Sequence, residues 1–241
     1  MNRRVNLFEM ESGNTMQIFI KRKVYLLLAL IVFSAGCHFQ LHNSKIKGSG
    51  VRLKQNREVA PFTSIAMEGA FAVDIVCQKQ QSVEVEGDDN LLATITTEVS
   101  NNVLHISSNR SYSVNDAIQI TIAVPNLDGV STAGAGKLDI SGIKNEKFEI
   151  DTNGATTIKV AGETKVLDID TSGAGRIDAH KLRAARGVVE AKGVARVDVN
   201  VSEQLSVTVS GASHVTYQGD PVLTKTINGP GSVEKKEPEA S

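Results

Sequence analysis

Four stretches of the chain repeat one pattern and decide its fold: 129–139 (GVSTAGAGKLD), 149–159 (EIDTNGATTIK), 168–178 (DIDTSGAGRID) and 188–198 (VVEAKGVARVD). Each has a glycine at its centre, with a branched aliphatic residue four positions before it and another four positions after it. The full series has six glycines, separated by 20, 19, 20, 18 and 18 residues: Gly134, Gly154, Gly173, Gly193, Gly211 and Gly229. Self-similarity at this period is the signature of a repeat architecture.

The apolar and small residues of each unit stand at even distances from the glycine. On extended chain such residues all point to one side, which is the period of a β-strand. One unit of about 20 residues cannot bury this side alone, so the units must stack with like residues above like. The sequence therefore predicts an all-β, single-stranded β-helix (β-solenoid) with coils of about 18–20 residues. One interior column is predicted to contain Leu138, Ile158, Ile177, Val197 and Val215.

We call the strand that runs into each glycine the entry strand, and the strand that leaves it the exit strand.

A similar unit surrounds Gly69, with Ile65, Val73 and Ile75 at matching offsets. Between residues 87 and 127 the period is lost, and we expect further coils there with a longer loop around 109–116. The last repeat has Lys225 where the others have an aliphatic residue, which is typical of a terminal cap.

Several motifs together resemble one known family. They are Gly69–Ile75 (GAFAVDI), Gly87–Leu92 (GDDNLL), Ser131–Gly136 (STAGAG) and Ile227–Val233 (INGPGSV). They are similar to the bacterial head GIN domain family of autotransporter adhesin heads, over about residues 61–234. The resemblance implies a right-handed β-helix with a pectin-lyase-like shape and no assigned catalytic residues. Since one fold can carry many functions, it supports the fold more strongly than the function.

The N-terminal stretch predicts an export signal. A basic segment (21–23) precedes an apolar run (24–33), which is too short to span a bilayer. The run ends in Ser34-Ala35-Gly36-Cys37, which resembles a lipoprotein signal with Ser34 where Leu is usual. We expect residues 1–36 to be removed and Cys37 to be lipidated. His38 follows in place of the inner-membrane retention residue Asp, which favours an outer-membrane lipoprotein; whether Met1 or Met16 is the true start is left open.

The expected organisation is a signal peptide (1–36), a flexible tether (37–60), a β-solenoid head (61–235) and a disordered tail (236–241). Lys plus Arg number 26 and Asp plus Glu 27, so the chain lacks the positive charge of a nucleic-acid binder. It also has no Trp, which argues against an aromatic platform for bases or sugars. Cys77 shares the inward parity of Val73 and Ile75, so we expect a buried, inert thiol.

The outward residues of the exit strands form two predicted columns. One is mostly basic: Lys137, Thr157, Arg176, Arg196 and His214. The other is mostly acidic: Asp139, Lys159, Asp178, Asp198 and Thr216. Opposite charges in neighbouring columns offset the repulsion within each column. The alternative is that Asp139, Asp178 and Asp198 are the carboxylates of a pectinase-like active site.

The entry strands carry a second charged surface, the acidic patch: Glu149, Asp151, Asp168, Asp170 and Glu190. Lys147 and Lys165 lie at its margin, and no basic column is expected beside it. The five carboxylates should form two adjacent outward columns over three coils. Carboxylates about 5 Å apart can share a hard cation, so the sequence suggests weak divalent binding there and no dedicated metal site.

These observations favour a non-enzymatic lipoprotein of the cell envelope that serves as an adhesion or interaction module. The alternatives are a polysaccharide-active, pectinase-like β-helix enzyme and a purely structural envelope lipoprotein. No cofactor and no nucleic-acid partner is expected. The expected partners are the membrane, through lipidated Cys37, and an envelope glycan or protein; self-association and the choice between periplasm and cell surface are left open.

Overall fold

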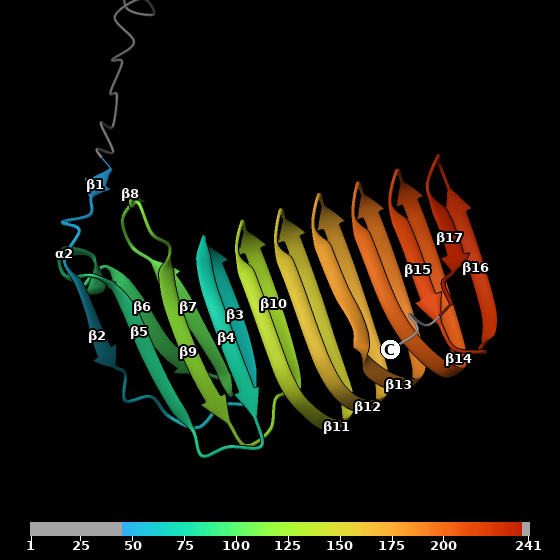
Figure 1. Cartoon of the computed structure of the whole chain (residues 1–241), viewed down its shortest axis with the longest axis horizontal. Coiled ribbons are helices and arrows are strands. Elements are labelled where there is room, and N and C mark those ends of the chain that lie inside the picture. Colours follow the sequence, from blue (N-terminus) through green and yellow to red (C-terminus); the bar gives the residue numbers. More distant parts are fainter. Residues whose placement is uncertain (1–44, 238–241) are drawn as a thin grey trace, which may run out of the picture. The chain divides into compact units, whose positions relative to one another are not determined.

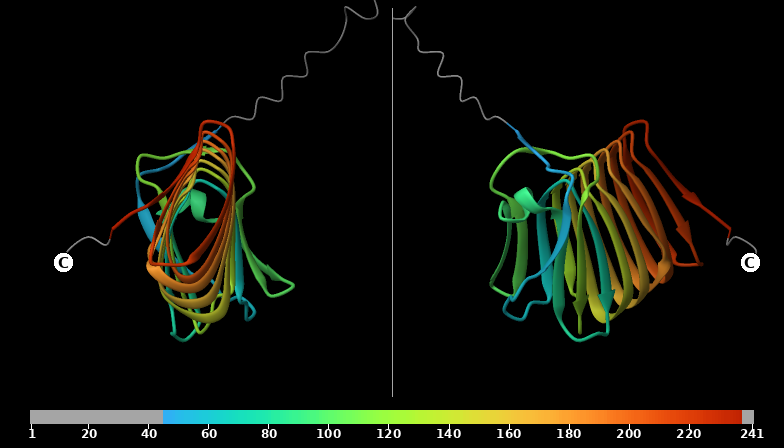
Figure 2. Two further views of the ribbon diagram at one scale, coloured as in Figure 1. Left: turned by 90° about the vertical axis from the view of Figure 1, so that its right-hand side faces the viewer. Right: turned by 60° about the vertical axis from the view of Figure 1, so that its left-hand side comes forward.

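The computed structural model describes residues 45–237, and within them one sheet is wound into a β-solenoid of about five turns (Figure 1). The view along the stack shows the coils as flattened loops, one behind another (Figure 2, left). The entry strands lie on one flat side and form the entry sheet, and the exit strands form the exit sheet on the other. The predicted signal peptide and Cys37 lie outside the described residues.

The regular coils occupy the C-terminal part of the chain. Their strands are β10 (Gly129–Gly134), β11 (Lys137–Gly154), β12 (Thr157–Gly173), β13 (Arg176–Gly193), β14 (Arg196–Gly211), β15 (His214–Gln218), β16 (Val222–Asn228) and β17 (Ser232–Lys235). Each of β11 to β14 starts as an exit strand, passes through the rounded bend and ends as the next entry strand. All their pairings are parallel, as stacking of like residues requires.

The interior columns are those predicted from the sequence. Leu138 pairs in register with Ile158, Ile158 with Ile177, and Ile177 with Val197, which pairs with Val215. All five side chains are at most 1% exposed. Each coil contributes one residue to this column. Stacking the coils therefore buries a continuous apolar surface that a single coil could not bury alone.

The sharp edge of each coil is the glycine corner. Gly134, Gly154 and Gly173 stack in register, each at a φ above +110°, a conformation that only glycine adopts without strain. The buried hydroxyl groups under the corners bond to one another, as between Thr152 and Thr171, whose oxygens lie 2.8 Å apart. These bonds satisfy polar groups that would otherwise be costly to bury.

The N-terminal region contains the remaining elements. They are β1 (Ile46–Lys47), β2 (Arg52–Asn56), β3 (Ser64–Gly69), β4 (Phe71–Cys77), β5 (Ser82–Asp88), α2 (Asp89–Leu92), β6 (Ile95–Ser100), β7 (Val103–Ser108), β8 (Tyr112–Ser113) and β9 (Ile118–Val124). β3 and β4 form the coil around Gly69, as expected. β7 and β9 form another coil, with the expected long loop between them.

Two expectations for this region were wrong. Residues 45–60 were assigned to a flexible tether, but β2 pairs antiparallel with β5, and β1 pairs with β8. Further coils were expected throughout residues 87–127, but β6 pairs antiparallel with β7, and β5 pairs antiparallel with β9, so the parallel stack ends there. The antiparallel pairings close the N-terminal end, a result that a search for one repeated period does not detect.

Chain order and spatial order differ here, which explains why the period disappears. The β3–β4 coil lies between the β7–β9 coil and the β10–β11 coil, because β4 pairs with both β9 and β11. The chain therefore leaves β4 toward the N-terminal end of the stack to form β5. It later passes from β9 back toward the C-terminal end to form β10. The two connections contact each other where the backbone N–H of Gln78 donates to the Pro125 carbonyl oxygen at 3.3 Å.

At the C-terminal end, β14 is the one partner of β16 and β15 the one partner of β17 among the strands of residues 45–237. Lys225 occupies the interior position in register with Val207, as the sequence predicted, and it is exposed because no coil follows among the described residues. Within residues 45–237, no helix has the length and apolar character needed to cross a membrane.

Candidate functional site

The exit sheet carries the two charged columns in the predicted register. Lys137, Thr157 and Arg176 stack in one column, and their neighbours Asp139, Lys159 and Asp178 stack in the other. Ion pairs connect the columns: Lys137 Nζ lies 2.8 Å from Asp139, and Arg176 Nη2 lies 3.1 Å from Asp198 in the next coil. This surface is a charge ladder that largely neutralises itself.

Asp178 is the most enclosed of the carboxylates considered for catalysis, and His180 Nδ1 contacts its Oδ1. Burial acts to raise the pKa of Asp178, but the hydrogen bond and charge of His180, with a smaller effect of Arg176, outweigh it and lower the pKa. A general acid in glycoside hydrolysis needs a raised pKa. Asp139 and Asp198 are each paired with a cation as well, so the three carboxylates form part of a charge ladder.

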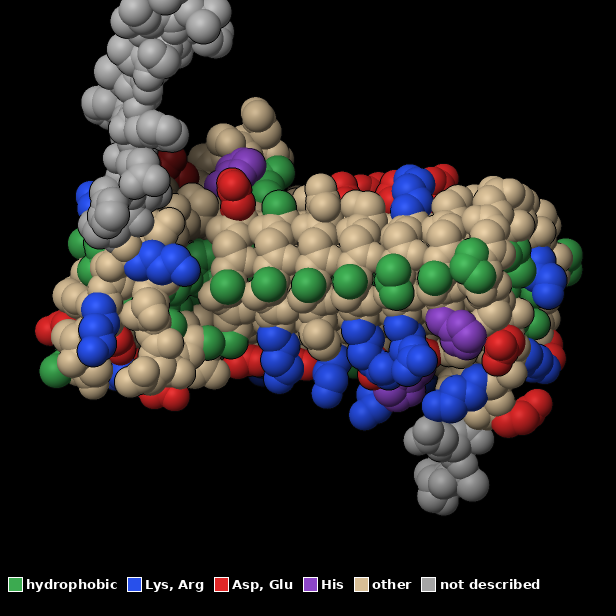
Figure 3. Space-filling model, turned by 90° about the horizontal axis from the view of Figure 1, so that it is seen from above, with side chains coloured by type: hydrophobic (Ala, Val, Ile, Leu, Met, Phe, Trp, Pro, Cys, Tyr) green, Lys and Arg blue, Asp and Glu red, His purple; other side chains and the backbone are tan. Residues whose placement is uncertain are grey.

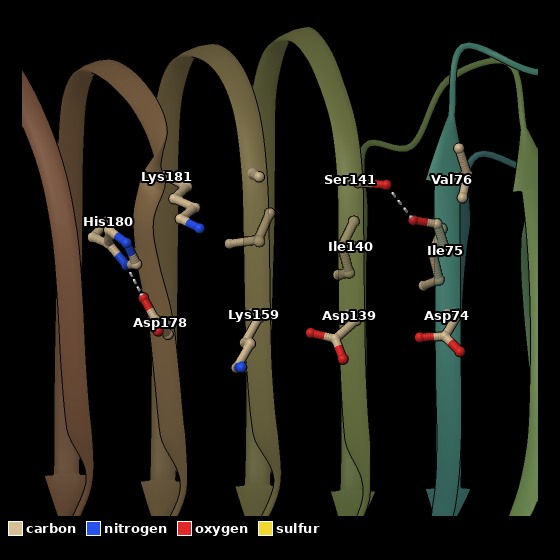
Figure 4. A pocket seen from close by; sticks show the side chains of 12 residues that line it. Asp74, Ile75, Val76, Asp139, Ile140, Ser141, Lys159, Asp178, His180 and Lys181 are labelled. Carbon is tan, nitrogen blue, oxygen red and sulfur yellow. Dashed lines mark hydrogen bonds and ion pairs between the residues drawn. The ribbon is translucent and has the colours of Figure 1, made fainter. Parts of the chain in front are cut away.

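A hollow of about 400 Å³ opens on this sheet across β4, β11, β12 and β13. Figure 4 shows Asp178, Lys159, Asp139 and Asp74 in a row across these coils, with His180, Lys181 and Ser141 above them. Val76 and Ala161 supply part of the apolar lining. The row of charges follows from the sequence repeat, whereas the repeat alone does not indicate the hollow.

The hollow lies where β-bulges interrupt the hydrogen-bonded ladder. Two residues of β11, Ser141 and Gly142, face the single residue Ala161 of β12. On the other side, β13 has an extra residue at His180 relative to β12. The shorter coil is therefore flanked by two coils that bulge, and the surface is recessed between them.

Side chains replace part of the interrupted ladder. Ser141 Oγ donates to the Ile75 carbonyl oxygen at 3.3 Å, and Asn200 Nδ2 donates to the His180 carbonyl oxygen at 3.3 Å. A sequence signal for this irregularity exists in the glycine spacing, since the β12 coil has 19 residues between two coils of 20. The spacing shows that residues must bulge but does not show where.

The entry sheet carries the acidic patch at the predicted positions. Glu149 pairs in register with Asp168, and Asp151 with Asp170, which pairs with Glu190. The five carboxylates thus form two adjacent columns over three coils. Among residues 45–237, no three acidic, histidine or cysteine side chains are grouped so that they could hold a metal ion.

No basic column was expected beside the acidic patch, but individual lysine side chains do pair with its carboxylates. Lys147 pairs with Glu149 and lies 3.4 Å from Asp168. Lys192 Nζ lies 3.1 Å from both Asp170 and Glu190, and its hydrogen bonds to these groups raise the pKa of its ammonium group. A long lysine side chain can reach a carboxylate on the neighbouring coil even though the two residues are not paired in register. Weak cation binding by the acidic patch stays a prediction.

Seen from above the glycine corners, the two sheets carry different charges (Figure 3). A row of small apolar side chains runs along the ridge: Ala135, Ala155, Ala174, Val194 and Ala212. Lys, Arg and His side chains gather on the exit-sheet side, and the acidic patch lies on the entry-sheet side. The molecule therefore offers two chemically distinct faces.

Cys77 is buried as predicted, at 3% exposure. Burial raises the pKa of its thiol to about 11, so little reactive thiolate exists near neutral pH. It is a free cysteine.

The family model described as "Putative auto-transporter adhesin, head GIN domain" matches residues 61–221. The chain belongs to this family, as the sequence motifs suggested. No curated protein matches the chain.

Solved structures share the fold. A putative adhesin from Bacteroides fragilis is 22% identical, with a TM-score of 0.64; the match covers 80% of this chain and 99% of that chain. A protein from Parabacteroides distasonis, described as a putative lipid binding protein, is 19% identical over 80% of this chain and 99% of its own, with a TM-score of 0.49. A putative adhesin from Parabacteroides merdae is 15% identical with the same coverage and a TM-score of 0.48. At these identities the likeness shows the fold alone.

Proposed function

We propose that the protein is a lipid-anchored, non-enzymatic adhesion or interaction module of the bacterial cell envelope. Membership of the head GIN family supports an adhesion-like or interaction role and an envelope or surface location. The observation that carries the proposal is the exit sheet: a flat charged face, held by stacked strands, with a hollow in it. Such a face binds a ligand without needing to rearrange, which lowers the entropic cost of association.

The pairing of the exit-sheet carboxylates supports a non-enzymatic role. Asp139 and Asp198 each have a cationic partner, Asp178 is paired with His180, and the pKa of Asp178 is lowered. A polysaccharide-active enzyme is tested by following the release of reducing ends from acidic and neutral polysaccharides. Sustained release that Asp178→Asn abolishes would overturn the non-enzymatic assignment.

The lipid anchor rests on the Ser34-Ala35-Gly36-Cys37 sequence, and the outer membrane rests on His38. Mass spectrometry of the mature N-terminus tests the first part. We expect a chain that begins at a diacylated Cys37, and a soluble chain when Cys37→Ser is expressed. An unmodified Cys37, or a mature terminus elsewhere, would contradict the lipoprotein assignment.

Binding is tested with the soluble Cys37→Ser chain and washed envelope fractions from the same bacterium. We expect saturable binding that competes with unlabelled chain and weakens with salt, because the exposed face is charged. The same Cys37→Ser chain carrying Lys137→Gln and Arg176→Gln should bind less strongly to the envelope fractions. Absence of saturable binding, together with loss of envelope integrity when the chain is deleted, would instead favour the purely structural alternative.

A further inference from the structure

The hollow on the exit sheet contains two cations without partners. Lys159 and Lys181 line it, and neither makes an ion pair or a side-chain hydrogen bond with any residue from 45 to 237. Both are exposed. The neighbouring cations differ: Lys137, Arg176 and Arg183 are each paired with a carboxylate. The charge ladder is therefore incomplete within the hollow; Arg196, which also makes no ion pair with any residue from 45 to 237, lies outside it.

The position of Lys159 makes its lack of a partner informative. It stands in register between Asp139 and Asp178, yet these carboxylates pair with Lys137 and His180 instead. Figure 4 shows its side chain along the row of acidic groups, with Lys181 on the next coil. Because the two lysines lie on adjacent coils, anionic groups of a ligand in the hollow can pair with their ammonium groups without displacing an existing ion pair.

The rest of the lining fits a hydroxylated ligand. Asp74 receives a single long hydrogen bond, 3.4 Å from Gln119 Nε2, and so retains acceptor capacity. Val76, 39% exposed, and Ala161 offer apolar surface to the C–H groups of a sugar ring. Charged donors, free acceptors and small apolar contacts in one hollow are what recognition of an acidic sugar requires.

The direction of the hollow favours a polymer. It crosses four coils, and coils stack about 4.8 Å apart, so it runs about 15 Å along the solenoid axis. Each coil adds roughly the length of one sugar ring in an extended chain. A linear chain along the axis would thus place successive rings over successive coils.

We propose that this hollow binds a linear acidic polysaccharide, with its anionic groups on Lys159 and Lys181 and its hydroxyl groups on Asp74. The inference rests on the proposed interaction function and names its ligand class. A neutral glycan would leave both ammonium groups unpaired. A peptide strand would find a sheet face here, where the backbone groups are mostly engaged in the ladder.

The test measures binding of the purified full chain, in detergent, to polygalacturonate, hyaluronate and heparin, with dextran as the neutral polymer. We expect salt-sensitive binding to at least one acidic polymer and none to dextran. Lys159→Gln with Lys181→Gln should weaken that binding at least tenfold or so, since two charge-assisted contacts are lost. The charge-matched control, Lys47→Gln with Lys79→Gln, changes two exposed lysines outside the hollow and should retain affinity.

A second pair of variants separates the hollow from general charge. Ala161→Trp fills the hollow and leaves the charge unchanged, so it should abolish binding, whereas Ala174→Trp on the exposed ridge should not. Thermal melting shows whether each variant is folded. Binding to none of the acidic polymers, equal binding to dextran, or equal losses in both lysine variants would overturn the proposal. If the chain still binds envelope fractions in that case, only the ligand class fails and the interaction function stands.

Discussion

The two ends of the solenoid are finished differently. At the N-terminal end, α2 and the antiparallel strands β5 and β6 close the stack, and Leu91 of α2 is fully buried. At the C-terminal end, β16 exposes Val222 at 73% and Ile227 at 39%, and no described strand pairs with its outer edge. At the N-terminal end added structure covers the core, although β2 and β6 also have outer edges without a described partner strand; at the C-terminal end Lys225 stands at the interior position of a coil that nothing described covers.

The difference shows two solutions to one physical problem. A stack of parallel strands ends in unpaired backbone groups that can recruit another chain. The N-terminal region breaks the repeat and ends in short antiparallel strands and α2, so its edge does not offer the parallel register of another coil. The C-terminal end keeps the repeat and replaces one aliphatic residue by a charge, which opposes stacking of another coil because the ammonium group would then be buried.

The largest expected effect tests whether the two regions fold as one unit. Ile177→Asp places an unpartnered carboxyl group in the interior column and should destabilise the domain by roughly 3 kcal/mol or more. We expect the thiol of Cys77, in the N-terminal region, to become reactive too, because the coils share one core. Denaturant unfolding and thiol labelling measure both.

The control for this variant is Thr157→Asp, on the outward side of the adjacent coil, which should cost little. Equal tolerance of the two changes would mean that the register is wrong. Loss of the coils with Cys77 still protected would show that the two regions are independent.

Next in size is a comparison of the two ends themselves. Leu91→Ala removes a fully buried side chain from the seal and should cost about 2–5 kcal/mol. Ile227→Ala, at the free edge, should cost less than about 1 kcal/mol because the side chain is already 39% exposed. Urea unfolding of both variants measures the difference, and similar losses would contradict the description of the C-terminal end as open.

A glycine pair compares the corners of the coils with the N-terminal segment. Gly173→Ala would place a Cβ 2.5 Å from the Gly154 carbonyl oxygen at a φ of +113°, so strain of roughly 1–3 kcal/mol is expected. Gly50→Ala has a φ of +81° but no atom within 4 Å, and should cost about 1 kcal/mol from the backbone alone. If Gly50→Ala lowered the melting temperature more than Gly173→Ala, close contact between neighbouring glycine corners would not be what makes these positions sensitive to a Cβ atom.

The charge at the free edge is tested by Lys225→Val, which restores the aliphatic residue at that position. We expect concentration-dependent association of the purified chain, end to end through β16, measured by light scattering. Lys47→Val, in the N-terminal region, removes one charge in the same way and should leave the oligomeric state measured by light scattering unchanged. If Lys225→Val stays monomeric at high concentration, the charge is not what keeps the edge free.

The smallest effect concerns the acidic patch, which lies on the regular coils and not on the N-terminal region. Millimolar calcium should raise the melting temperature by less than about 2 °C, since Lys147 and Lys192 already contact four of the five carboxylates. Asp168→Asn with Asp170→Asn should remove the rise. No shift in the original chain, or an equal shift in the variant, would end the cation hypothesis.

The sequence by itself determined the repeated part of the molecule. The glycine corners, the interior column through Ile177 and the charged columns beside Asp139 all follow from period-2 parity and stacking of like residues. These features are local to each coil or repeat from coil to coil, so a linear pattern carries them. The resemblance of the motifs to the head GIN family pointed to the same fold.

Only the tertiary structure decided the N-terminal seal, the hollow and the partners of the lysines. β2 and β5 pair antiparallel across distant segments, and the β3–β4 coil is inserted between coils that come later in the chain. Coil lengths of 20, 19 and 20 residues require bulges, but the packing of neighbouring coils selects where they form. The physical reason is that the pairing of distant segments and the reach of long side chains depend on which arrangement buries the core and satisfies the backbone, a choice that no local pattern encodes.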